Sequence, residues 1–313
     1  MLYNTQAPTL TPLLRAISSV SKLWTKEQDH NFRQRYRRLP ELILFGLGTG
    51  LITALLIVLF RWLLELPEIL LAGFTNTASL AELPSHWRFI IPLSGAVLLW
   101  AYWRRQPSDS RRVGITHIHE RLSHHHGDLP MRNLINQLIG AALSLGTGQP
   151  VGREGPAVHL GAALSSWLGS RLGLPSSMQR LLVGCGSAAA IAALFNLPLA
   201  GILFAMEVVL LGYNLIGFTA IIISAVSADF VTQMILGKPE SIIVATDQLA
   251  LYLELPLLLL LSLLIASGGW IFQQTQIFCV GLTQLSLSSR LLIAGTLVGL
   301  VAQIFPEVLT PIH

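Results

Sequence analysis

The chain alternates between long apolar runs and short, strongly polar segments. Residues 42–60 carry no charged side chain, and a helix of that length, rising 1.5 Å per residue, just crosses the roughly 30 Å hydrocarbon core of a bilayer. Further apolar runs that could form membrane helices cover residues 89–103, 155–168, 181–206, 208–228, 255–289 and 291–306. This pattern predicts an all-α polytopic membrane protein.

The apolar run 133–151 is interrupted by residues that disturb helices, namely Gly140, Gly146, Gly148 and Pro150. Broken helices at membrane depth are tolerated where the backbone lines a cavity or a binding site. Proline fits the first turn of a helix. We therefore expect one helix to stop within the membrane and another to start near Gly155 and Pro156.

Small residues dominate residues 184–193, which read GCGSAAAIAA. Lipid offers no hydrophobic drive for helices to associate, so small side chains favour membrane-helix packing by letting two backbones approach closely. We expect close helix contacts in this segment.

Composition and charge distribution support the membrane interpretation. The 313 residues are 52% hydrophobic and only 12% charged, against about 25% charged in ordinary soluble domains, so a soluble enzyme is excluded. The basic side chains gather beside the apolar runs, in residues 22–38 and 104–132. This bias is typical of cytoplasmic segments and predicts a cytoplasmic N-terminus in an inner membrane, with no nucleic-acid partner.

The two cysteines, Cys185 and Cys279, lie in separate apolar runs. That placement indicates neither a disulfide framework nor a thiolate metal site, and nothing in the sequence indicates a cofactor.

The most informative segment is 146–160, GTGQPVGREGPAVHL, where Arg153 and Glu154 interrupt a glycine-rich apolar region. An ionisable side chain at membrane depth costs about 2.5–3.5 kcal/mol, so it marks a functional site by default. The free N–H groups at the start of the next helix can hold an anion, and Glu154 could occupy the same position until it is protonated or displaced. A solvent loop holding an Arg–Glu pair is the alternative.

Two motifs, GREGP at 152–156 and FNLPLAGILFAMEV at 195–208, closely resemble the CLC family of chloride channels and chloride/proton antiporters. The resemblance includes the intervening GCGSAAAIAALF and covers most of the chain from about residue 42. It implies a homodimer with one pore per subunit, built from two inverted repeats whose broken helices point their N-termini at chloride. It assigns the gate to Glu154 and the surrounding anion loop to Gly152, Arg153, Gly155 and Pro156.

The family's first anion loop reads GSGIP, and the matching stretch here is RVGIT at 112–116. The resemblance makes Val113, Gly114 and Ile115 candidate anion-binding residues. Valine replaces the family's serine and Thr116 replaces its proline, so the motif leaves the preferred anion open.

One position bears on the coupling of transport to protons. Proton-coupled family members often carry two consecutive glutamates where this chain has Glu207 followed by Val208. Valine there resembles the channel branch and predicts passive, uncoupled conduction. Glu207 itself could equally be a buried, hydrogen-bonded structural carboxylate.

The resemblance also divides the chain. We expect a cytoplasmic segment at 1–40, a first CLC-like repeat at 41–240, and the beginning of a second, truncated repeat at 241–313. The family's second anion loop, of GIFxP type, does not occur in the segment from residue 291 onward. The alternative function is therefore a truncated, non-conducting membrane protein, or one subunit of a split transporter.

A cluster of histidines lies in the polar stretch before residue 130. Its members are His117, His119, His124, His125 and His126, with Glu120 and Asp128 nearby. We interpret the cluster as a solvated loop and assign no metal site. A regulatory divalent-metal site is the alternative.

Overall fold

The computed structural model describes residues 39–75, 79–210, 215–237, 251–281 and 285–309. The predicted cytoplasmic segment 1–40 lies almost entirely outside these ranges. Helices account for nearly all of the described residues, and no strand occurs among them. The all-α prediction is therefore confirmed for this part of the chain.

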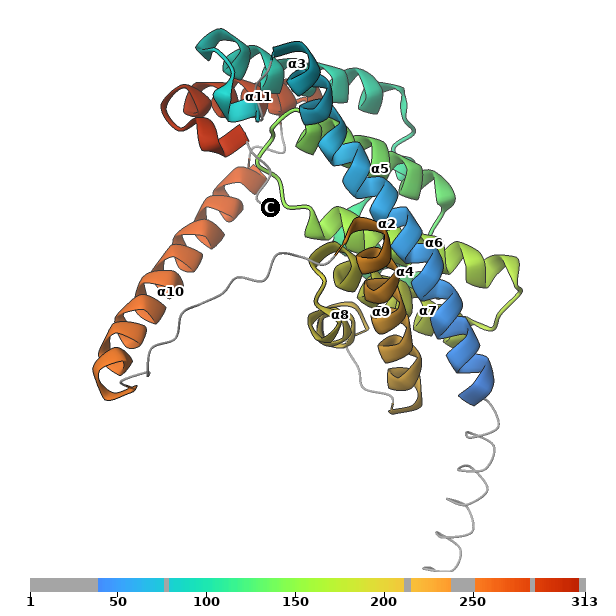
Figure 1. Ribbon diagram of the computed structural model, residues 1–313. Coiled ribbons are helices and arrows are strands. Elements are labelled where there is room, and N and C mark those ends of the chain that lie inside the picture. Colours follow the sequence, from blue (N-terminus) through green and yellow to red (C-terminus); the bar gives the residue numbers. More distant parts are fainter. Residues whose placement is uncertain (1–38, 76–78, 211–214, 238–250, 282–284, 310–313) are drawn as a thin grey trace, which may run out of the picture.

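Ten α-helices make up most of the described chain (Figure 1). They are α2 (Leu39–Thr75), α3 (Ser85–Arg105), α4 (Gly114–His124), α5 (Met131–Gly146), α6 (Glu154–Arg171), α7 (Ser176–Phe195), α8 (Pro198–Phe204), α9 (Leu215–Leu236), α10 (Leu251–Gly281) and α11 (Leu287–Ile304). A π-helical turn, η3 (Ala205–Val209), continues α8, and three short 3-10 turns are η1 (Leu80–Glu82), η2 (Asp109–Arg111) and η5 (Pro306–Leu309). The predicted run 255–289 is thus divided between α10 and α11.

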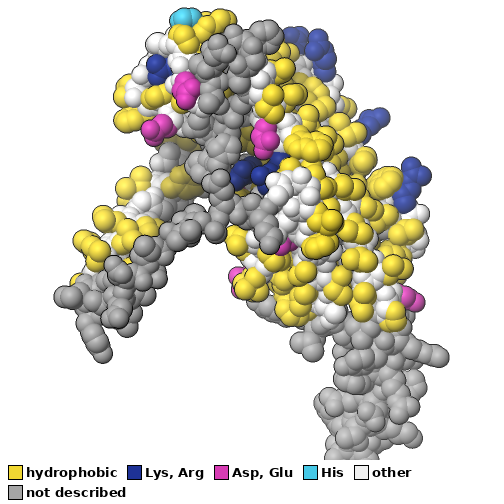
Figure 2. All heavy atoms as spheres, viewed as in Figure 1, with side chains coloured by type: hydrophobic (Ala, Val, Ile, Leu, Met, Phe, Trp, Pro, Cys, Tyr) yellow, Lys and Arg dark blue, Asp and Glu magenta, His cyan; other side chains and the backbone are white. Residues whose placement is uncertain are grey.

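Five helices in the described part are long and apolar enough to cross a membrane. They are α2, α7, α9, α10 and α11. Figure 2 shows hydrophobic side chains covering most of the described surface in this view, with few basic ones. These features confirm an integral, multi-pass membrane protein.

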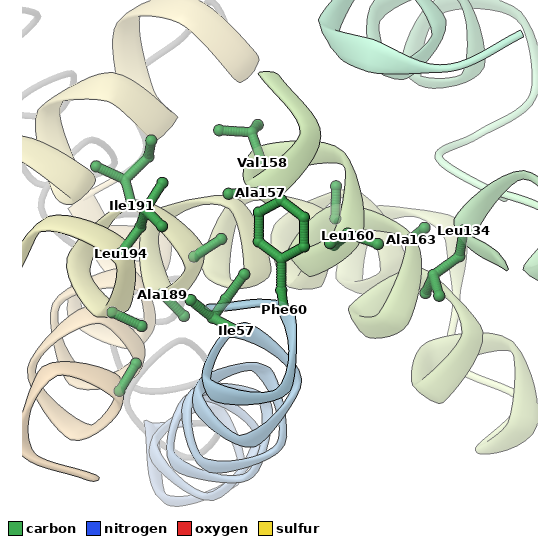
Figure 3. Close-up of a cluster of buried hydrophobic side chains, with 14 of the residues drawn as sticks. Ile57, Phe60, Leu134, Ala157, Val158, Leu160, Ala163, Ala189, Ile191 and Leu194 are labelled. Carbon is green, nitrogen blue, oxygen red and sulfur yellow. The ribbon is translucent and has the colours of Figure 1, made fainter. Parts of the chain in front are cut away.

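The core lies where α2, α6, α7 and α9 pack against one another. Ile57 and Phe60 of α2 meet Leu160 of α6 and Leu194 of α7 in one buried cluster (Figure 3). Phe60 is fully buried. This core holds the first turns of α6 in place.

The contact between α6 and α7 depends on glycine. A side chain added at Gly161 would collide with the carbonyl oxygen of Gly186, and one added at Gly186 would collide with the Ser165 hydroxyl. On the other side of α7, a side chain at Gly201 of α8 would meet the Ala188 carbonyl oxygen. The predicted close packing of the small-residue segment is confirmed.

The last described helices differ in their surroundings. Helix α11 packs against α3, where Gly295 lies against Pro92 and Ala96. Helix α10 stands apart from the other helices in Figure 1, and its side chains from Leu255 through Val280 are exposed.

Candidate functional site

A non-helical segment, residues 147–153, separates α5 from α6. Thr147 ends α5 by donating its hydroxyl to the Leu143 carbonyl oxygen at 2.7 Å. Gly148 then turns the chain with a φ of +75°, a conformation that favours glycine. The Gln149 amide donates to the Pro92 carbonyl oxygen at 2.9 Å and ties the segment to α3. The predicted break between two helices is confirmed.

Helix α6 begins at Glu154, with Arg153 as its N-cap residue and Pro156 in the first turn. The first hydrogen bond across this boundary runs from the Ala157 N–H to the Arg153 carbonyl oxygen at 3.1 Å. The earlier N–H groups of a helix have no acceptor within it. A Cβ added at Gly155 would meet no atom within 4 Å, so the space beside this helix start is open.

The Glu154 side chain is exposed and folds back over Gly152. A Cβ built at Gly152 would collide with the Glu154 carboxylate. Glycine at position 152 therefore leaves room for the carboxylate at the start of the helix.

Arg153 is half-buried and does not pair with Glu154. Its guanidinium lies over the Phe195 ring, 5.3 Å from the ring centroid. The salt bridges within the described residues join Arg112 to Glu120 and Arg121 to Asp128. The Arg153–Glu154 ion pair of the solvent-loop alternative is therefore not formed in the described residues.

A cavity of about 350 Å³ adjoins the start of α6. Its lining comprises Leu145, Gln149, Pro150, Val151, Gly152, Arg153, Glu154, Glu307, Val308 and Leu309. Glu307 belongs to η5, far along the chain, and no local sequence pattern indicates its presence here. The neighbouring Leu309 packs against Gly148, which places η5 beside the loop. A second cavity, of about 250 Å³, is lined in part by Gly152 and Pro156.

The predicted first anion loop forms the start of α4. Val113 is the N-cap residue, and Gly114 has a φ of +82° with no atom within 4 Å of an added Cβ. The Asn133 amide fixes the chain before it by donating to the Arg112 carbonyl oxygen at 2.7 Å. Ile115 packs against the core cluster that contains Ala157 of α6. The starts of α4 and α6 therefore share one core.

The structure brings some predicted site residues together and leaves others apart. Gly152, Arg153 and Glu154 line one cavity, and Gly152 also lines the second cavity with Pro156. Neither cavity lining includes residues 113–115.

Glu207 lies in η3, the π-helical turn, and is exposed. The alternative interpretation of Glu207 as a buried carboxylate is therefore wrong. The next residue, Val208, accepts a hydrogen bond at its carbonyl oxygen from the His119 ring.

The prediction that the histidine cluster is a solvated loop is wrong for its first members. His117 and His119 belong to α4, and His117 is buried. His117 bonds to His159 and His119 to the Val208 carbonyl, so the two rings have separate partners. Within the described ranges, no three His, Cys, Asp or Glu side chains gather closely enough to hold a metal ion.

Comparison with known proteins gives consistent matches. The family model "Voltage gated chloride channel" matches residues 94–313. A "putative chloride channel protein ClcB-like" of Ralstonia nicotianae is 29% identical over 277 residues, which are 83% of this chain and 62% of the relative. An "H(+)/Cl(-) exchange transporter ClcA" of Vibrio cholerae is 35% identical over 139 residues, 44% of this chain and 30% of the relative. The chain thus spans less than two thirds of either relative.

A solved structure has the same fold. The X-ray structure of a slow cyanobacterial Cl⁻/H⁺ antiporter aligns with a TM-score of 0.67 at 23% identity, covering 84% of this chain and 63% of that one. The match shows that this chain has the fold of that solved structure over the aligned part.

Proposed function

Because the chain belongs to the voltage-gated chloride channel family, we propose that it takes part in CLC-type transport of a small anion such as chloride. The observation that carries this proposal is the position of Glu154. Its carboxylate lies at the start of α6, beside open space at Gly155, in the wall of a cavity of about 350 Å³.

The proposed anion site uses the backbone more than cationic side chains. The first N–H groups of α6 and the positive end of its dipole attract an anion. A full buried positive charge would hold the ion more tightly than rapid passage allows. Arg153 fits this scheme, since its guanidinium lies over Phe195 and serves to position the loop.

Glu154 is the proposed gate. Its carboxylate carries the same charge as the anion and lies at the same helix start, so both cannot occupy that position. Protonation or displacement of the carboxylate would free the site. Gly152 makes room for the folded-back side chain, while Gly155 and Pro156 shape the first turn.

The start of α4 is the proposed second anion element. Gly114, like Gly155, borders open space at a helix start. Val113 and Ile115 flank it, and Ile115 packs against the same core as α6. The ion would pass between the two helix starts.

Coupling to protons is a separate matter. The prediction of channel-type conduction, based on Val208, is not supported, because the Vibrio relative is named as an H⁺/Cl⁻ exchanger and the solved structure is that of an antiporter. No comparison favours the alternative of a non-conducting product. We propose anion transport as the function. Chloride-driven proton movement into liposomes that contain the purified protein would establish exchange.

The basic segments favour a cytoplasmic N-terminus in an inner membrane. The family resemblance favours a homodimer. Both are part of the proposal, and crosslinking in native membranes together with accessibility labelling of the N-terminus would test them.

The test of the gate is chloride efflux from liposomes that contain the purified 313-residue protein. Glu154→Gln and Glu154→Ala each remove the titratable charge. We expect the ratio of efflux at about pH 4.5 to that at about pH 7.5 to fall toward one, because neither variant has a carboxylate at the helix start that a proton can neutralise. The same vesicles report proton movement.

Glu41→Gln is the matched control, since Glu41 is an exposed carboxylate in the first turn of α2. It should keep the pH dependence of the unmodified protein. Unchanged pH dependence in both Glu154 variants would contradict the gate. Absence of efflux from all proteins would contradict the proposed function itself.

A further inference from the structure

A pair of histidines lies buried between α4 and α6, apart from the proposed anion gate. His117 Nδ1 and His159 Nε2 are 3.1 Å apart, a hydrogen-bond distance. The two ring centroids are 5.4 Å apart. His159 is fully buried and His117 is 5% exposed. Two imidazoles in such contact share a single hydrogen atom between them.

The pair reaches a polar cavity through His117. This cavity has a volume of about 360 Å³. Its lining comprises Asp109, Ser110, Arg112, His117, Glu120, Arg121, His125, Pro130, Arg132 and Asn133. Asp109, Arg112 and Arg132 are exposed, so the cavity opens at the surface. Water in it can therefore exchange protons with the His117 ring.

The far end of the pair is an unpartnered nitrogen. His159 Nδ1 is buried and has no hydrogen-bond partner among the described residues. A buried polar atom without a partner costs roughly 1–3 kcal/mol. An imidazole at this position therefore costs more than an apolar side chain of the same size would.

The proton count of the pair follows from imidazole chemistry. Two neutral rings hold two protons, one shared between His117 Nδ1 and His159 Nε2 and one on either outer nitrogen. The remaining outer nitrogen is then free to accept one more proton. When His117 Nε2 is the free one, the proton can come from water in the cavity, and the product is a single positive charge on the hydrogen-bonded pair.

We propose that the His117–His159 pair is a proton-binding site, filled from the polar cavity lined by Arg112, Glu120 and Arg132. A hydrogen bond from an imidazolium to a neutral imidazole is charge-assisted and stronger than one between two neutral rings. The second histidine therefore stabilises the proton that the first one receives. The bound charge lies beside α6, the helix that begins at Glu154.

Charged groups around the pair are unevenly distributed. The described titratable side chains on the elements packed against it, or next to them in the chain, are Asp109, Arg112, His119, Glu120, Arg121, His124 and His125 in or near α4, Arg132 on α5, Glu41, Arg61 and Glu65 on α2, Glu154 and Arg171 on α6, Arg180 and Cys185 on α7, and Glu207 in η3. Arg121, Glu120, Arg112 and His125 act electrostatically on His117. On His159 the acting group is His117 itself. Glu154 is not among the groups that act on either ring.

The test uses histidine labelled with ¹⁵N in the full 313-residue protein, reconstituted in lipid nanodiscs and titrated by NMR. Variants that lack either His117 or His159 show which NMR signal belongs to which ring. Because interacting sites titrate together, we expect the His117 and His159 signals to change at one common midpoint. His159→Phe keeps the bulk of the ring but removes the acceptor, and should lower the His117 midpoint by about one pH unit or more.

His159→Gln provides the conservative comparison, because its amide oxygen can still accept from His117 Nδ1. It should restore at least part of the shift seen with His159→Phe. His124→Gln, at an exposed histidine of the same helix, should leave the His117 midpoint unchanged.

Two results would overturn the proposal. One is that both rings stay neutral across the whole pH range in which the protein remains folded. The other is that His117 titrates with the same midpoint whether or not His159 is present. Neither measurement involves anion flux, so failure of this proposal is distinguishable from failure of the proposed transport function.

Discussion

Helices α7 and α10 are both long and apolar enough to cross a membrane, but they have opposite surroundings. The membrane-length stretch of α7 has a mean hydropathy of 1.5 and is 78% buried, whereas that of α10 has a higher hydropathy of 2.2 and is 0% buried. Hydropathy therefore does not decide which helix lies in the core. The two helices differ in side-chain size, since α7 carries GCGSAAAIAA and α10 carries a run of leucines at 257–261.

The comparison separates two properties of a membrane helix. Apolar character allows a helix to lie in lipid, but lipid gives no hydrophobic reason for it to pack against another helix. Packing comes from close van der Waals contact, which small residues allow. Helix α7 meets α6 and α8 at glycines, while α10 presents large side chains to its surroundings. The proposed anion site lies at the start of α6, which packs on α7 through these glycines.

The strongest test of this difference places a large residue at one glycine in each helix. Gly186→Leu should destabilise the protein by more than about 3 kcal/mol, because even a Cβ there collides with Ser165 and Gly161. Gly268→Leu in α10 should change stability by less than about 1 kcal/mol, since a Cβ there meets nothing within 4 Å. Denaturation of both purified variants in the same detergent measures the difference.

Equal losses of stability in the two leucine variants would break the comparison. They would mean that α10 packs as tightly as α7 in the membrane.

A smaller effect is expected where only one methyl group is added. Gly201→Ala would press against the Ala188 carbonyl oxygen, at the contact of α8 with α7, and should cost about 1–3 kcal/mol. Gly269→Ala is the matched control, because position 269 is open and alanine favours a helix over glycine by roughly 0.5–1 kcal/mol. Thermal denaturation should therefore show a lower midpoint for the first variant and an equal or higher one for the second. The opposite order would show that the α7–α8 contact is loose.

Much of the fold was predictable from local sequence. Long charge-free runs indicated the membrane helices, the small-residue segment indicated close packing, and Gly155 with Pro156 indicated where α6 starts. Each of these signals acts through residues adjacent in the chain. The division of 255–289 into two helices was less accessible, since its apolar character is nearly continuous.

The site was predictable only as far as its local motif extends. Residues 152–156 carry both the charge and the backbone freedom that mark a helix start, and the first three of them line one cavity. Glu307 reaches the same cavity because α11 packs on α3, a contact between distant segments. His117 meets His159 across two helices for the same reason. Spacing along the chain contains no information about either contact.

The central claim is that an anion and the Glu154 carboxylate compete for the start of α6. Chloride binding to the purified protein, measured by calorimetry at neutral pH, tests it most directly. Replacing the charged group by glutamine removes the competitor, and two like charges near 4 Å repel by about 1–4 kcal/mol. We predict that Glu154→Gln binds chloride about tenfold or more tightly than the unmodified protein, whereas equal affinity in the two proteins would contradict the claim.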